Sequence, residues 1–220
     1  MLAGLERRSG GVFVIWLNNG EENRLTVELL DAVTAAWQTA EREGARVIVT
    51  ASRSRFFSNG VELDGVARAA EVLERLERLV RLIVKSGVPS VALLSGHAVG
   101  GGLLLALAHD WRVARRDKGL FFVPAVDLGI FLPPPLLRLA VARLGSGGAA
   151  KLLLSRERLT GVAALALGLV DHLVEGGEAA DMFAFAEARA RDVGQREACA
   201  HVKRIVMEAV LANEGASAKL

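Results

Sequence analysis

The stretch that decides the fold is Ser95-Gly-His-Ala-Val-Gly-Gly-Gly-Leu-Leu-Leu-Ala-Leu-Ala-His-Asp110. The apolar run at 88–94, just before this stretch, predicts a strand. The second half of the stretch itself, 100–109, predicts a buried helix. The glycines between them let the backbone approach a ligand without a Cβ clash. Because the first N–H groups of a helix have no partner within that helix, this turn suits either a phosphate or an oxyanion.

A second glycine turn, Arg55-Phe-Phe-Ser-Asn-Gly-Val-Glu-Leu63, follows the predicted strand at 46–51 and has the same form. Phosphate cradling is the rival interpretation, but a dinucleotide fingerprint needs Gly-x-Gly-x-x-Gly after the first strand. The pattern here is Gly96-x-x-x-Gly100-Gly-Gly in mid-chain, and no Gly-Lys-Ser/Thr follows it. A purely structural alternative is that these glycines only allow close helix packing.

Strands and helices alternate along the first two thirds of the chain. Strands are predicted at 11–18, 46–51, 88–94, 111–114, 120–123 and 170–174, with a polar loop at 52–60. Helices are predicted from Thr26, where Thr is a good N-cap, and at 67–86, 100–109, about 136–144, 148–154, 160–167, about 178–192 and about 196–212. The pattern predicts a single α/β domain over residues 1–220, with a core to about 175, C-terminal helices over about 176–212 and a flexible tail at 213–220.

Composition excludes several classes of protein. The formal net charge is +2 and the basic residues are scattered, so no nucleic-acid partner is expected. The uncharged run at 88–109 is interrupted by Pro89 and by glycines, so it does not predict a membrane span. The single cysteine, Cys199, cannot form a disulfide within the chain, which favours a reducing compartment. One cysteine and four separated histidines do not have the spacing of a metal site.

The two glycine turns and the segments after them resemble the crotonase (enoyl-CoA hydratase/isomerase) superfamily. The resemblance rests on Phe56-Phe-Ser-Asn-Gly60, on 96–102, on Arg115-Arg-Asp-Lys-Gly119, on Val126-Asp-Leu-Gly129 and on Leu159-Thr-Gly161 with Ala166-Leu-Gly-Leu-Val-Asp171. It covers nearly the whole chain. The first and third of these segments look most like peroxisomal Δ3,Δ2-enoyl-CoA isomerases of the plant kind.

This resemblance implies a spiral of ββα turns with a helical C-terminal region. It also implies that the backbone N–H groups of Val61 and Gly101 hold the thioester carbonyl of an acyl-CoA and stabilise an enolate. Coenzyme A then enters as part of the substrate, and no separate cofactor is expected. We expect Arg53, Arg55 and Lys85 to be candidates for the CoA phosphates. The predicted substrate contacts are Ser58, Asn59, Gly60, Glu62, Leu63, His97, Gly100, Leu104 and Leu128.

The sequence departs from the superfamily where its members carry the general base. The two glutamates of the hydratases fall on Leu104 and Ala125, and no Glu lies between Leu103 and Phe131. Three explanations stay open. Ala125 could replace a glutamate in a variant chain, another acid could act, or the protein could bind acyl-CoA without turnover. Asp127 is one substitute base, since residues i and i+2 of an extended segment face the same side, and it is equally typical of a turn.

Two further acids, Glu62 and Asp64, flank the first glycine turn, where a helix N-terminus is the alternative role for both. We therefore expect an enzyme of fatty-acid β-oxidation of the Δ3,Δ2-enoyl-CoA isomerase type, with Ala125 in place of the base. The alternative is an inactive acyl-CoA-binding protein of the same fold, and hydration or thioester hydrolysis is a third possibility.

The resemblance also implies a homotrimer or a dimer of trimers. The last residues, Ala218-Lys219-Leu220, differ by one small residue from the Ser-Lys-Leu address that a peroxisomal import receptor reads. We expect a peroxisomal protein, or otherwise a cytoplasmic one.

Overall fold

The computed structural model describes residues 2–155, 157–175, 179–192 and 194–212. Its strands are β1 Ala3–Arg8, β2 Val12–Leu17, β3 Val47–Ser52, β4 Phe56–Ser58, β5 Ser90–Leu94, β6 His97–Val99, β7 Trp111–Arg115, β8 Phe121–Phe122 and β9 His172–Val174. Its helices are α1 Val27–Arg42, α2 Val66–Lys85, α3 Gly101–Ala108, α4 Pro134–Leu154, α5 Gly161–Ala166, α6 Ala179–Arg191, α7 Arg196–Val206 and α8 Glu208–Leu211, with a 3-10 turn at Ser9–Gly11.

The strands form two sheets. The larger has the order β1-β2-β3-β5-β7-β9, in which β1 and β2 are antiparallel and every other pair is parallel. The smaller has the order β4-β6-β8 and is parallel. From β3 to β8, consecutive strands alternate between the two sheets, and each pair is followed by a helix: β3 and β4 by α2, β5 and β6 by α3, and β7 and β8 by α4. This confirms the predicted ββα spiral.

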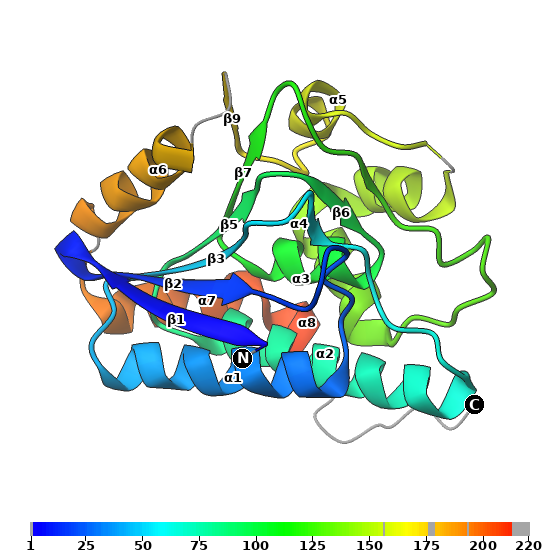
Figure 1. Ribbon diagram of the computed structural model, residues 1–220, viewed down its shortest axis with the longest axis horizontal. Coiled ribbons are helices and arrows are strands. Elements are labelled where there is room, and N and C mark those ends of the chain that lie inside the picture. Colours follow the sequence, from blue (N-terminus) through cyan, green and yellow to red (C-terminus); the bar gives the residue numbers. More distant parts are fainter. Residues whose placement is uncertain (1, 156, 176–178, 193, 213–220) are drawn as a thin grey trace.

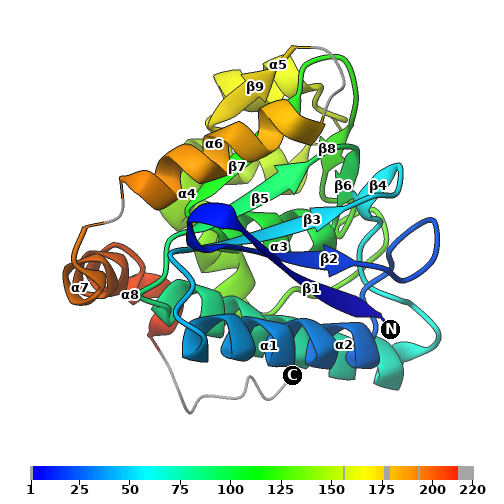
Figure 2. The same ribbon diagram turned by 60° about the vertical axis from the view of Figure 1, so that its left-hand side comes forward.

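Helices cover both faces of the larger sheet (Figures 1 and 2). On one face α1, α2 and α3 bury a large core that includes Trp37, Leu76 and Leu105. On the other face α6 places Met182 and Phe183 against Val14, Val49 and other apolar residues of β2, β3, β5 and β7. Since both faces of these parallel strands are covered, they consist of near-continuous apolar residues, as the sequence shows.

Local chemistry explains where the helices begin. The hydroxyl of Thr26 accepts a hydrogen bond from the Leu29 N–H at 3.2 Å, which caps α1 as predicted. The Thr160 hydroxyl caps α5 in the same way. Pro134 and Pro135 occupy the first turn of α4, where a missing N–H costs no intrahelical bond. Gly145, with φ 69° and ψ 169°, kinks α4 where the sequence predicts two separate helices.

Three strands lie outside the predicted elements. β1 has the polar sequence AGLERR and is an edge strand. It is held to β2 by antiparallel backbone pairing and by the Trp16 indole N–H, which donates to the Glu6 carboxylate at 2.7 Å. β4 and β6 fall in segments predicted as a loop and a turn. Each has three residues, too few to show a strand period in the sequence. The predicted tail at 213–220 lies outside the described residues.

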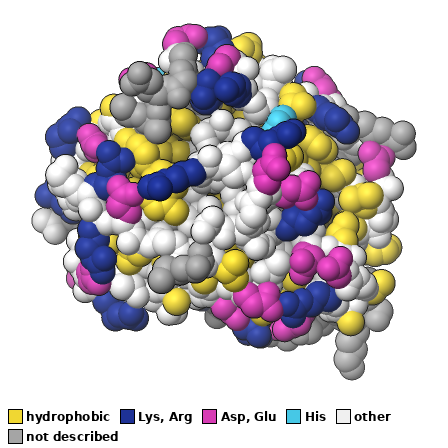
Figure 3. Space-filling view, in the orientation of Figure 1, with side chains coloured by type: hydrophobic (Ala, Val, Ile, Leu, Met, Phe, Trp, Pro, Cys, Tyr) yellow, Lys and Arg dark blue, Asp and Glu magenta, His cyan; other side chains and the backbone are white. Residues whose placement is uncertain are grey.

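In the part of the chain that the structure describes, no helix has both the length and the apolar character that a membrane crossing requires. On the face drawn in Figure 3, Lys and Arg side chains alternate with Asp and Glu side chains. That face therefore has no broad surface of one charge sign, in keeping with the small net charge.

Candidate functional site

The two glycine turns meet at one place in the fold. An ideal Cβ on Gly60 would lie 3.1 Å from the Val99 carbonyl oxygen and 3.6 Å from the Gly101 nitrogen. Gly60 also has φ +88°, a conformation that favours glycine. A Cβ on Gly101 would lie 2.8 Å from Cγ2 of Val61. The parallel pairing of β4 with β6 thus brings the residues predicted to supply the two amides into contact.

Neither of these two amide groups takes part in the hydrogen bonds of the adjoining bridge or helix. Leu25 pairs with Val61 through its N–H, which donates to the Gly60 oxygen at 2.8 Å, and through its oxygen, which accepts from the Glu62 N–H at 3.0 Å. Since residues 60 and 62 make these bonds, the Val61 N–H points away from Leu25. Gly101 is the first residue of α3, whose first N–H groups have no intrahelical partner. The pair suits an oxyanion.

The amides border a cavity of about 310 Å³, named here the amide cavity. Its walls come from both glycine turns, from α2 and from the segment after β8. Its lining residues are Arg24, Asn59, Gly60, Val61, Leu63, Leu73, Val99, Gly100, Gly101, Phe122, Val123, Pro124, Ala125, Leu128, Ile130 and Leu132. This brings together Val61, Gly101 and Ala125 with five of the predicted substrate contacts: Asn59, Gly60, Leu63, Gly100 and Leu128.

No carboxylate lines the amide cavity among the described residues. Ala125 lies in its wall, and its side chain offers only a methyl group. Leu104 is fully buried in α3, within the core. Neither position can carry a proton, so these walls supply no general base.

The substitute acids lie elsewhere. Asp127 was predicted as a substitute base on an extended segment, and the structure shows that the predicted backbone conformation is wrong. Residues 125–129 form a turn, closed by the Ile130 N–H, which donates to the Ala125 oxygen at 2.8 Å. Asp127 is exposed and does not line the amide cavity. In a turn, successive side chains do not alternate between two faces as they do in a strand, so Asp127 does not face the same side as Ala125. Glu62 and Asp64 also lie outside the lining, on the segment leading to α2.

Two other predicted contacts do not reach the cavity. Ser58 is buried, and its hydroxyl accepts a hydrogen bond from the Gly60 N–H at 3.2 Å, so it shapes the turn that presents Val61. His97 lines a different cleft, because its position on β6 directs it away from the amides. Its Nδ1 accepts from the Leu120 N–H at 3.2 Å, and burial together with the nearby Arg55 lowers its pKa.

The cation at the amide cavity is Arg24, which sequence reasoning missed. It follows Asn23, a buried residue whose side-chain amide donates to the Ser52 hydroxyl at 2.7 Å and to the Phe56 carbonyl at 3.2 Å. These bonds fix the loop before α1 against β3 and β4. The Arg24 guanidinium lies 2.7 Å from the Glu22 carboxylate. Nothing in the spacing around Arg24 singles it out, since its place depends on the pairing of Leu25 with Val61.

The predicted phosphate contacts have other positions. Arg53 and Arg55 line a separate cleft of about 910 Å³, at the carboxyl ends of the parallel strands and beside α6. Arg53 lies over the Trp16 ring, 4.4 Å from its centroid, and 3.6 Å from the Glu6 carboxylate. Lys85 is the last residue of α2 and lines neither cavity. None of these three side chains lines the amide cavity.

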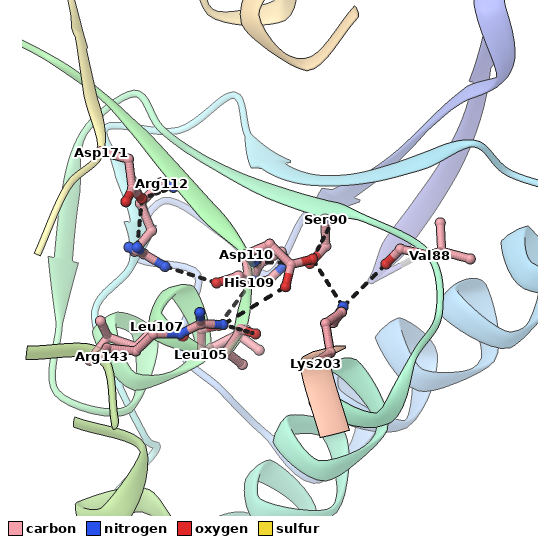
Figure 4. Close-up of polar contacts among 11 residues, drawn as sticks. Val88, Ser90, Leu105, Leu107, His109, Asp110, Arg112, Arg143, Asp171 and Lys203 are labelled. Carbon is pink, nitrogen blue, oxygen red and sulfur yellow. Dashed lines mark hydrogen bonds and ion pairs between the residues drawn. The ribbon is translucent and has the colours of Figure 1, made fainter. Parts of the chain in front are cut away.

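The carboxyl end of α3, opposite the amide that Gly101 provides, is held by two arginines (Figure 4). The Arg143 guanidinium donates to the carbonyls of Leu107 at 2.9 Å and Ala108 at 3.2 Å. Arg112 donates to the His109 carbonyl at 2.8 Å. Carbonyls in the last turn of a helix have no partner within it, and cations there also interact favourably with the helix dipole. Burial lowers the pKa of Arg143 to about 10.

His109 is enclosed at the same end of α3. Its Nδ1–H donates to the Leu105 carbonyl at 3.0 Å, so its Nε2 accepts from the Thr50 hydroxyl at 2.8 Å. This is the neutral ring, and full burial lowers its pKa to about 4. The structure therefore places His109 in a structural role.

Asp110 connects α3 to the C-terminal helices (Figure 4). Its carboxylate accepts from the Lys203 ammonium of α7 at 2.9 Å and from the Ser90 N–H and hydroxyl, each at 2.9 Å. Lys203 also donates to the Val88 carbonyl at 3.3 Å. This buried ion pair fixes α7 against the start of β5. Within the described part of the chain, no group of three His, Cys, Asp or Glu residues could hold a metal ion.

The sequence matches a known protein family. The model of the family described as enoyl-CoA hydratase/isomerase matches residues 7–217 of this chain. The chain belongs to the enoyl-CoA hydratase/isomerase family. The family resemblance predicted from the two glycine turns is therefore confirmed.

Relatives within the enoyl-CoA hydratase/isomerase family include isomerases. Enoyl-CoA delta isomerase 3 of Arabidopsis thaliana is 32% identical over 178 residues, which cover 76% of this chain and 74% of the relative. A probable enoyl-CoA hydratase of Mycobacterium tuberculosis is 34% identical over 184 residues, covering 84% and 73%.

Solved structures share the fold. An enoyl-CoA isomerase of Mycobacterium tuberculosis superposes with a TM-score of 0.87 over 96% of this chain and 93% of that chain, at 24% identity. At that identity the likeness concerns the fold alone. The family membership and these relatives support an enzyme of the enoyl-CoA hydratase/isomerase type in fatty-acid metabolism.

Proposed function

We propose that this chain binds an acyl-CoA thioester in the amide cavity and that its reaction type is Δ3,Δ2-enoyl-CoA isomerisation. The observation that carries the proposal is the contact between Val61 and Gly101, which sets two backbone N–H groups at the wall of one apolar cavity. Isomerases among the relatives support the reaction type.

In this reaction a base removes a proton from C2 of a 3-enoyl-CoA. The electron pair moves onto the thioester oxygen as an enolate, which the amides of Val61 and Gly101 stabilise. A proton then adds at C4, and the double bond passes from C3–C4 to C2–C3, so that no atom is gained or lost. One donor of this kind contributes roughly 3–4 kcal/mol to the transition state. Leu104 offers nothing that could activate water, which disfavours hydration.

The same geometry favours one second candidate. Because no carboxylate lines the amide cavity among the described residues, the chain is also suited to binding acyl-CoA without turnover. An acid that does act has to enter from outside the lining, as Glu62 or Asp127 would. The two candidates differ in turnover and agree on the ligand.

Arg24 is the proposed contact for a phosphate of CoA. It lies in the wall of the amide cavity, next to Asn59 and Gly60. A guanidinium forms charge-assisted hydrogen bonds to phosphate oxygens. An Arg24→Gln variant should weaken CoA-ester binding without weakening the binding of the same acyl group on a pantetheine thioester that lacks phosphate.

The deciding experiment is an isomerase assay with 3-hexenoyl-CoA on the parent chain, Ala125→Glu and Ala125→Gln. Turnover by the Glu variant alone would show a scaffold that lacks its base, since Gln has the same size and no exchangeable carboxyl proton. An active parent chain would point to another acid, with Asp127→Asn and Glu62→Gln as the next variants. If no form binds 3-hexenoyl-CoA in calorimetry, the proposal is wrong.

We further propose a homotrimer or a dimer of trimers, and peroxisomal residence. The exposed apolar side chains of Val202, Ile205 and Val206 on α7, and of Val162 and Leu165 on α5, support self-association. The peroxisomal relatives of Arabidopsis support the location. Light scattering measures the first. For the second, an Ala218-Lys219-Leu220 deletion should abolish binding to a purified peroxisomal import receptor.

A further inference from the structure

Ala125 stands between two cavities. Besides the amide cavity, it lines a second cavity of about 480 Å³, named here the α4 cavity. The two cavities share three lining residues, Ala125, Ile130 and Leu132. They are therefore neighbouring spaces with a common wall at the position where other members of the superfamily carry a general base.

The shared wall is apolar. Ala125 and Ile130 are joined across the 125–129 turn by the hydrogen bond from the Ile130 N–H to the Ala125 oxygen. The only side-chain atom of Ala125 is its methyl carbon, and the residue is 7% exposed. A methyl group leaves more space at this wall than any longer side chain would.

The α4 cavity extends along one side of helix α4 and is almost wholly hydrocarbon. Its remaining lining residues are Val126, Phe131, Leu137, Val141, Ser146, Ala149, Ala150, Leu153 and Leu154. Ser146 supplies the one side-chain polar group in this lining, and no charged residue belongs to it. Phe131 and Leu154 are 79% and 70% exposed. Figure 3 shows hydrophobic side chains gathered along the right-hand side of the view, where Figure 1 places the segment that follows β8.

We propose that this protein takes long, unbranched acyl chains, which pass from the amide cavity over Ala125 into the α4 cavity. The inference rests on the proposed function and names the substrate class of the same site. The amide cavity holds the thioester and the first carbons, and the α4 cavity holds the methyl end. An alkyl chain suits such a lining because it has no polar group that would be left without a hydrogen bond.

The residue at position 125 then sets chain length as well as proton chemistry. A carboxylate there would place a charged, hydrated group in the shared wall and oppose the passage of methylenes. The alanine that removes the base opens the route. The absence of a glutamate at position 125 is thereby linked to a wider range of acyl-chain lengths.

The test is calorimetry with butanoyl-, octanoyl- and dodecanoyl-CoA, each below its micelle-forming concentration. Each further buried methylene tightens binding by about fourfold, which corresponds to ~0.8 kcal/mol. The parent chain should therefore bind dodecanoyl-CoA at least about tenfold more tightly than octanoyl-CoA. Ala150→Trp, a substitution at an exposed residue of the α4 cavity, should abolish this gain.

Lys151→Trp is the matched control, since Lys151 is exposed on the same helix and lies outside the lining. It should keep the parent ratio between the two dissociation constants. An affinity that stops rising at octanoyl-CoA in the parent, or a ratio unchanged in Ala150→Trp, would overturn the inference. A change of oligomeric mass in Ala150→Trp with an unchanged ratio would assign the cavity to a second copy instead. Failure of all three esters to bind the parent would reject the proposed function itself.

Discussion

A Cβ added to Gly101 would stand 2.8 Å from Cγ2 of Val61, so the two residues that present the paired amides are in contact. The contact couples the shape of the amide cavity to the absence of a side chain at position 101. Gly101→Ala adds a Cβ and keeps the N–H, whereas Gly101→Pro adds a ring and removes the N–H. Proline is compatible with the first turn of a helix, so α3 should persist in both.

We expect Gly101→Ala to weaken acyl-CoA binding by displacing Val61, and Gly101→Pro to weaken it further by roughly fivefold, as one lost hydrogen bond costs about 1 kcal/mol. Calorimetry on the two variants and the parent measures this difference. Equal affinities in the alanine and proline variants would remove the Gly101 amide from the site.

The Ala125→Glu variant should show a shifted pH profile. The new carboxyl lies in an apolar wall, and burial raises a carboxyl pKa above its ordinary value of about 4.3. Because the ionised form is the base, kcat/KM should rise with pH through that raised pKa. A pH–rate series with 3-hexenoyl-CoA tests this, with Ala125→Gln as the control that should show no such rise.

Stability should fall in mild acid because of His109. Its folded pKa of about 4 lies below the ordinary value of 6.5, so the unfolded chain binds more protons between these values. The free energy of unfolding therefore decreases as pH falls from about 6.5 to about 4, by on the order of 3 kcal/mol from this residue. Urea titrations of the parent and His109→Gln check it: the parent should have the steeper pH dependence over this range.

Removing the buried guanidinium of Arg112 should be costly. Its Nη2 lies 2.6 Å from the Asp171 carboxylate, and it donates to the carbonyls of Leu169 and His109. Arg112→Leu should lower the free energy of unfolding by about 3–5 kcal/mol, because the Asp171 carboxylate loses its ion pair and two carbonyls lose a hydrogen-bond donor. The neighbouring Arg116, whose partner Glu175 is exposed, supplies the control: Arg116→Leu should leave the urea midpoint unchanged. Equal effects of the two substitutions would contradict this account.

Most of the fold follows from patterns in the sequence. Thr26 begins α1 where its hydroxyl predicts a cap, and the alternation of strands and helices gives the α/β class. The exceptions have two causes. β4 and β6 are short and owe their strand conformation to partners distant in the sequence, whereas β1 is polar and pairs with the adjacent β2.

The predicted site residues also fall into two groups. The residues fixed by motif, Val61 and Gly101, and the alanine at 125 meet at one cavity. The residues chosen for their charge do not: Arg53 and Arg55 lie in another cleft, and Asp127 projects from a turn. A charged residue that is close in sequence to a motif can lie on another side of the sheet. Its position in the sequence therefore does not show which cavity it lines.

By itself the sequence determined the family, the two amide-bearing turns and the lack of a glutamate at Leu104 and Ala125, because these depend on residue identity and local backbone conformation. Only the tertiary structure decided that Arg24 reaches the amide cavity, that Ala125 lines both this cavity and the α4 cavity, and that His109 lies neutral in the core. These properties arise between segments distant in the chain, where packing and burial determine which side chains meet and which lose water.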